Sequence, residues 1–123
     1  MAYTTIDDGS KYFTTLLYTG NATDNRNLTN DANAGDFKPD LLWIKERSST
    51  SSHQVLDSTR GSSLAILPDQ NNAAEDEDAN RVQAFQTNGF QIGTASTVNQ
   101  DTITMVAWQW KANGGSTTTN DAS

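Results

Sequence analysis

Apolar residues in this chain occur in short runs that polar turns separate, a pattern typical of β proteins. The run LLWIKE at residues 41–46 predicts a strongly buried strand. Residues 12–18, rich in aromatic residues and Thr, predict another strand, because such side chains fit a pleated surface. Weaker strands are expected at residues 52–57 and 63–67.

Residues 103–111 form the longest predicted strand. Odd and even positions of a strand lie on opposite faces, and here both sets include apolar side chains, so we expect a central position in a sandwich. Before this strand, residues 82–85 and 90–93 flank the dipeptide Asn88-Gly89. Asn-Gly between two apolar runs is the strongest short signal for a β-hairpin.

Polar segments separate these runs. Residues 20–36 are almost entirely Asn, Asp, Thr, Ala and Gly, with Leu28 as the one large apolar residue, so we predict a long surface loop. Residues 69–80 are expected to form a second, acidic loop. Residues 113–123 have the Gly/Ser/Thr-rich composition of a flexible linker, which leaves residues 1–112 as a single domain.

These patterns predict an all-β protein, an antiparallel β-sandwich of jelly-roll or lectin-like type with about seven or eight short strands and long polar loops. The expected core contains Trp43, Ile44, Leu56, Phe85, Phe90, Val106 and Trp108. Trp110 lies at the end of its strand, so it is equally suited to the core and to stacking on a bound sugar. It is the candidate ligand-binding residue.

Composition narrows the classes of function. Of the 123 residues, 40 are Thr, Ser or Asn, and the formal net charge is −7. A nucleic-acid-binding protein needs a basic surface, which this chain lacks, and insertion into a membrane is not expected either. There is no Cys, which excludes disulfides, thiolate metal sites and a cysteine nucleophile. The first residues lack the basic and apolar regions of a secretory signal, so we expect synthesis in a cytosol.

No catalytic residues are expected. His53, the only histidine, could be combined with Asp57 and Ser62 or Ser63 into a hydrolase triad, but no G-x-S-x-G turn presents a nucleophile. We therefore expect His53 at a strand edge or on the surface, making one hydrogen bond. Arg47, Arg60 and Asp57 are interpreted as a structural ion pair that closes residues 46–61.

Metal sites are also not expected, and no cofactor is predicted. The acidic run at residues 75–78 has four consecutive carboxylates, which cannot all point at one ion, so it is interpreted as a solvated segment. Residues 24–36 contain interspersed acids and amides, and calcium binding in that loop stays an open alternative.

Four ordered blocks carry a resemblance to a known family. They are FKPDLLWIKER at residues 37–47, HQVLDSTRG at 53–61, NGFQIG at 88–93 and VAWQWKANGG at 106–115. Together they resemble a module of tail-fibre-like and other structural proteins of marine bacteriophages. The resemblance implies a virion component that is made in the host cytoplasm and released by lysis, and it transfers no catalytic or ligand-binding residue.

The function expected from this resemblance is a non-enzymatic virion structural protein of the tail-fibre or spike type, which serves surface display and host attachment. Two alternatives stay open, a head-stabilising capsid decoration protein and a free carbohydrate-binding module. The expected partners are other virion proteins, further copies of the chain (a trimer would suit the class) and a host-surface glycan.

Overall fold

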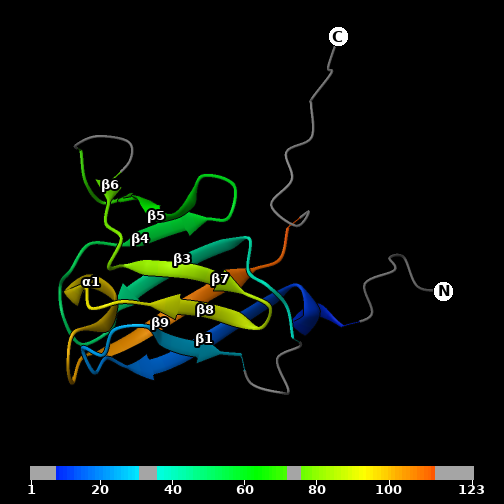
Figure 1. Ribbon diagram of the computed structural model, residues 1–123, viewed down its shortest axis with the longest axis horizontal. Coiled ribbons are helices and arrows are strands. Elements are labelled where there is room, and N and C mark those ends of the chain that lie inside the picture. The colour runs from blue at the N-terminus through cyan, green and yellow to red at the C-terminus, as the bar shows by residue number, and fades with distance from the viewer. Residues whose placement is uncertain (1–7, 31–35, 72–75, 113–123) are drawn as a thin grey trace, which may run out of the picture.

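The computed structural model describes residues 8–30, 36–71 and 76–112, and these form two antiparallel sheets packed face to face (Figure 1). A 3-10 turn, η1 (Gly9–Lys11), precedes the strands. The strands are β1 (Phe13–Thr19), β2 (Arg26–Thr29), β3 (Leu41–Glu46), β4 (Gln54–Asp57), β5 (Gly61–Ile66), β6 (Asp76–Glu77), β7 (Val82–Gln86), β8 (Gly89–Ile92) and β9 (Thr104–Trp110). The larger sheet has the order β1-β9-β3-β4-β5-β6 and the smaller one β2-β8-β7. The predicted all-β antiparallel sandwich is confirmed.

Strand β9 has the central position that its sequence predicts, because it pairs with β1 on one side and with β3 on the other. Its odd positions, Met105, Ala107 and Gln109, are fully buried between the sheets. In Figure 1 the strands β7 and β8 lie across β9, and they cover this inner face. The even positions of β9 therefore point away from the smaller sheet.

The predicted hairpin is confirmed as β7 and β8, joined by a two-residue turn at Thr87 and Asn88. Gly89 opens β8 with a φ of 127°, a conformation that an L side chain rarely adopts. A Cβ atom there would also lie 2.1 Å from the carbonyl oxygen of Leu28. Gly89 therefore allows β2 to approach the hairpin closely enough to pair with β8.

The prediction of an uninterrupted loop at residues 20–36 is wrong, since β2 lies inside it and pairs with β8. Leu28 explains this strand, because its side chain is buried in the core cluster. The second predicted loop, residues 69–80, likewise contains the short strand β6. With these two strands the sandwich has nine in the described residues, more than the seven or eight expected.

A single helical turn, α1 (Ser96–Asn99), connects β8 to β9 and was not predicted. It holds the loop after β1 through the buried side chain of Asn99. Asn99 Oδ1 accepts from the backbone N–H of Asn21 and from Arg26 Nη1 (both 3.1 Å). Its Nδ2 donates to the carbonyl oxygens of Thr23 (2.9 Å) and Gly93 (2.8 Å).

The predicted core is correct in part. Ile44, Leu56 and Phe90 are fully buried in the central cluster, and Phe85 packs against it while remaining half-buried. Val106 is also buried, on the other side of the larger sheet.

Trp43 and Trp108 need a correction, because they are half-buried and lie on the face of the larger sheet that the smaller sheet does not cover. The physical reason is the register: positions 43 and 108 alternate with the inward-facing Leu42, Ile44 and Ala107. The predicted linker at 113–123 lies outside the described residues. Within the described chain, no helix has the length and apolar character needed to cross a membrane.

Candidate functional site

The outer face of the larger sheet, the one turned away from the smaller sheet, carries three tryptophans on neighbouring strands. Trp43 of β3 is directly opposite Trp108 of β9, and Trp110 is opposite Leu41 of β3 and Phe13 of β1. Because a strand alternates faces at every residue, positions 108 and 110 must point the same way. The sequence therefore clusters the indoles as soon as β9 pairs with β3.

These side chains form a hollow of about 310 Å³, lined by Trp43, His53, Trp108 and Trp110. We call it the tryptophan hollow. The ring of Trp43 meets the ring of Trp108 edge to face, with centroids 6.1 Å apart, and meets His53 in the same manner at 5.7 Å. Edge-to-face contacts place the positive edge of one ring on the negative face of another, and they hold the rings in fixed directions.

His53 has a defined role in the hollow, because its Nδ1 accepts a hydrogen bond from the indole N–H of Trp43 (3.0 Å). A neutral imidazole that accepts at Nδ1 carries its proton on Nε2. His53 therefore presents an N–H donor at Nε2. The indole N–H groups of Trp108 and Trp110 likewise have no acceptor among the residues that the structure describes.

The segment after β5 supports His53 from one side of the hollow. Asp69 Oδ1 accepts from the backbone N–H of His53 (3.1 Å), and Gln70 Nε2 donates to Ser52 Oγ (2.6 Å). The little desolvation of Asp69 acts to raise its pKa, but hydrogen bonds from its own backbone N–H, from His53 and from Ser52 outweigh it and lower the pKa below its usual value. The rim beside His53 therefore carries a negative charge at neutral pH.

Further apolar side chains surround the tryptophan hollow on the same face. The ring of Phe13 lies 5.1 Å from that of Trp110, and Phe13 keeps 40% of its surface exposed. Leu17, opposite Val106, is 58% exposed, and Ile66 is exposed on β5. A folded domain rarely leaves several large apolar side chains exposed on one face unless that face contacts something, so this face is the strongest candidate for a functional surface.

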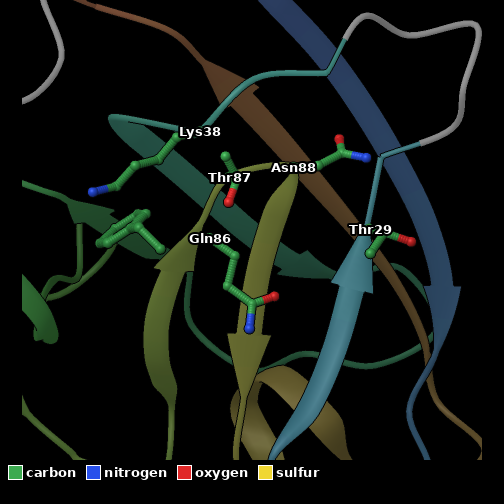
Figure 2. Close-up of a pocket in the computed structure, with 6 residues that line it drawn as sticks. Thr29, Lys38, Gln86, Thr87 and Asn88 are labelled. Atoms are coloured by element: carbon green, nitrogen blue, oxygen red, sulfur yellow. The ribbon is translucent and has the colours of Figure 1, made fainter.

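A second hollow, of about 490 Å³, lies at the tip of the β7–β8 hairpin. It is lined by Thr29, Lys38, Phe85, Gln86, Thr87 and Asn88. Figure 2 shows that the amine of Lys38 and the side-chain amides of Gln86 and Asn88 point in different directions. Because their polar groups do not converge on one point, this hollow is a weaker candidate than the aromatic one.

The geometry does not support the hydrolase triad of His53, Asp57 and Ser62, because each of these side chains bonds to a residue outside the triad. Trp43 donates to Nδ1 of His53, Asp57 pairs with Arg60, and Ser62 Oγ donates to the carbonyl oxygen of Gln83 (3.1 Å). Neither the carboxylate nor the hydroxyl is bonded to the imidazole, so these residues do not form a nucleophile with its base.

The predicted ion pair between Asp57 and Arg60 is confirmed, and it closes the β4–β5 turn. Partial burial acts to raise the pKa of Asp57, but the hydrogen bonds from the backbone and guanidinium of Arg60, with one from Thr59, lower it below its usual value. Arg47 does not take part, since its side chain has no ion pair in the described chain.

Metal binding gains no support from the parts of the chain that the structure describes, because they contain no group of three or more His, Asp or Glu side chains that could hold an ion. Residue 75 of the acidic run and residues 31–35 of the possible calcium loop lie outside the described residues.

The sequence singled out Trp110 as the candidate ligand-binding residue at the end of its strand, but it did not show that Trp43, Trp108 and His53 lie beside it. The available signal was the pair of indoles at 108 and 110, which share one strand face. His53 has no comparable signal, because only the pairing of β3 with β4 brings it beside Trp43.

The fold and this surface define a class, an all-β sandwich domain with an exposed aromatic hollow on one sheet. The chain belongs to the family described as Domain of unknown function (DUF7483), whose model matches residues 8–123. No curated protein matches the chain, and no solved structure does.

Proposed function

We propose that this chain is a non-enzymatic structural protein of a bacteriophage virion, of the tail-fibre or spike type, and that it attaches the particle to its host. The observation that carries the proposal is the tryptophan hollow on the face of the larger sheet that the smaller sheet does not cover. Binding residues are commonly displayed on a rigid scaffold in this way, and an exposed aromatic surface is typical of a contact site.

The polar chemistry of the described residues supports a binding role over a catalytic one. The buried or half-buried acidic side chains of the described residues bond to neighbouring groups. Asp40 accepts from Ser58 Oγ and the N–H of Ala112, Glu46 from the N–H of Ser51, Asp57 from Arg60, Asp76 from Arg81, and Asp78 from the N–H of Asn80. None of them lines the tryptophan hollow, whose lining consists of three indoles and one imidazole. A hollow of this kind can hold a ligand but offers no carboxylate for acid–base chemistry.

The resemblance in the four sequence blocks supports a location in the virion, with other virion proteins and further copies of the chain as partners. The block at residues 106–115 contributes Trp108 and Trp110, and the block at 37–47 contributes Trp43. The residues that carry the resemblance thus include those that line the hollow, and a host-surface glycan is the proposed external partner.

The test is immunogold electron microscopy of purified particles from a culture that expresses the gene, with antibodies raised against the 123-residue chain. Label at the tail or its fibres is the expected result. Label distributed over the heads would contradict attachment and would select a capsid decoration protein. Particles without label, with the protein found free in the lysate, would overturn the virion assignment and favour a free carbohydrate-binding module.

A further inference from the structure

We infer that the tryptophan hollow binds the ring of a neutral pyranose sugar, which stacks on the indoles of Trp108 and Trp110 and accepts a hydrogen bond from Nε2 of His53. The inference deepens the proposed function, on which it rests for the biological source of the sugar. Its physical basis is the combination of an apolar floor with unused N–H donors.

The floor of the hollow suits one face of a sugar ring. A pyranose has a face of C–H groups, whose partial positive charge is attracted to the negative face of an aromatic ring. The lining of the hollow, three indoles and an imidazole, is almost wholly apolar. The volume of the hollow, about 310 Å³, fits a ligand of one or two rings. Sites for small ligands commonly combine such an apolar lining with a few polar groups that fix orientation.

The polar groups left unpaired in the side chains that line the hollow are all donors. Nε2 of His53 and the indole N–H groups of Trp108 and Trp110 have no acceptor in the described parts of the chain. Ring and hydroxyl oxygens of a sugar would accept from them. A hydrocarbon surface could not accept from them, and each donor buried against it would lose its hydrogen bond to water without a replacement. This difference favours a sugar over the apolar face of a second copy of the chain.

Charge favours a neutral sugar. The chain has a net charge of −7, and the Asp69 carboxylate lies against the backbone of His53. A saccharide with a carboxylate or sulfate would be repelled by this rim.

Trp43 is a positioning residue in this arrangement. Its N–H is already used on Nδ1 of His53, so it is not available to the sugar. Because the Trp43 N–H donates to Nδ1 of His53, the proton of the imidazole is held on Nε2. The Nε2–H group lies on the other side of the ring from Trp43.

The test is a titration of the uniformly ¹⁵N-labelled chain with methyl glucoside, methyl galactoside, methyl mannoside and N-acetylglucosamine, with glucuronate as the anionic comparison. Two-dimensional NMR resolves the three indole N–H signals. With at least one neutral sugar we expect saturable shifts of the Trp108 and Trp110 signals that exceed the shift of the Trp43 signal. Glucuronate should bind more weakly than methyl glucoside.

Variants assign the contacts. Trp110→Ala should lower the affinity about tenfold or more, and Trp110→Phe, which keeps a ring but removes the donor, should lower it less. Leu17→Ser is the matched control, because Leu17 is exposed on the same face but does not line the hollow. It should leave the affinity unchanged.

For Trp43→Phe, the ¹⁵N shifts of the His53 ring should move toward a mixture of tautomers, and the affinity should fall while the fold is retained. A purely structural role for Trp43 would leave the ring shifts unchanged.

Two outcomes would overturn the inference. The first is no shift with any of the four neutral sugars while the spectrum shows a folded chain. The second is a dimer in solution that Leu17→Ser and Trp110→Ala both dissociate, which would make the face a contact between copies. Either outcome leaves the immunogold result unaffected, so failure here and failure of the virion assignment are distinguishable.

Discussion

Gln109 and Asn30 join the two sheets through the interior of the sandwich. Gln109 lies on β9 and Asn30 directly follows β2, both are buried, and Nε2 of Gln109 donates to Oδ1 of Asn30 over 2.7 Å. The remaining atoms of the two amides, Oε1 of Gln109 and Nδ2 of Asn30, have no partner in the described structure. This single bond therefore satisfies only half of a buried polar pair.

Replacing one member of this pair should destabilise the protein. Gln109→Leu removes the hydrogen-bond partner that the described structure gives the side chain of Asn30, and we expect the free energy of unfolding to fall by about 1–3 kcal/mol. The double variant Gln109→Leu/Asn30→Leu removes all of the buried amide atoms, so its loss should be smaller than the sum of the two single losses. Urea denaturation followed by tryptophan fluorescence measures this, and strictly additive losses would contradict the pairing.

Asn99→Ala should be more damaging, because it removes a side chain that makes four hydrogen bonds to Asn21, Thr23, Arg26 and Gly93. We expect a loss of about 2–4 kcal/mol, since several buried groups lose partners at once. Faster exchange of the backbone N–H of Asn21, measured by NMR, should accompany it. The matched control is Asn27→Ala on the exposed face of the smaller sheet, and a comparable loss there would argue against a special role for Asn99.

Tyr18 should make stability fall in alkaline solution. Burial raises the pKa of its phenol well above the ordinary value, although the nearby Arg26 guanidinium acts in the opposite direction. In the unfolded chain Tyr18 ionises at about pH 10, whereas in the folded chain it stays neutral at that pH. The stabilisation from Tyr18 is therefore complete below that pH and is lost as the pH rises above it.

Tyr18→Phe tests this directly. It removes the hydrogen bond from the Tyr18 hydroxyl to the carbonyl oxygen of Val98 (2.8 Å), so stability at pH 7 should fall by about 1 kcal/mol. The decline in the free energy of unfolding between about pH 10 and 11 should also become shallower. Tyr12→Phe controls for the loss of a hydroxyl from an exposed tyrosine at pH 7. A decline that stays as steep in Tyr18→Phe would refute the assignment.

Gly89 and Gly61 form a matched pair for measuring the close approach of β2 to the hairpin. Both have positive φ, 127° and 117°, but a Cβ on Gly61 would meet nothing within 4 Å. Gly61→Ala should therefore lower the free energy of unfolding only by the cost of placing an alanine at positive φ, about 1–2 kcal/mol. Gly89→Ala should lose more and should speed exchange of the Asn30 N–H, which is bonded to Asn88 O. Equal losses in thermal denaturation would contradict this explanation.

The strands that the sequence predicted best are those whose own side chains supply the burial. Strand β3 contains Leu42 and Ile44, both fully buried, and its bounds match the predicted residues 41–46. The Asn88-Gly89 signal likewise predicted the hairpin from local turn chemistry. In both cases the information lies within a few residues of the chain.

Strand β2 could not be predicted in this way, because Arg-Asn-Leu-Thr has one apolar side chain in four. Residues distant in the sequence stabilise it as a strand. Its backbone pairs with β8, and the side chain of Arg26 donates to Asn99. The tryptophan hollow was missed for a related reason. Apolar residues on both faces of β9 predicted burial on both sides, whereas the smaller sheet covers only one of them.

The pairing of β1 with β9 also determines how the domain would respond to tension. Phe13 is opposite Trp110, and the N–H of Lys111 donates to the carbonyl oxygen of Tyr12 (2.8 Å), so residues 12 and 111 lie side by side at one end of this ladder. A pulling force applied between these two points would load the hydrogen bonds between β1 and β9 one after another, beginning at this end. A sandwich held through them would therefore yield at low force, by peeling β1 away from the Trp110 end first.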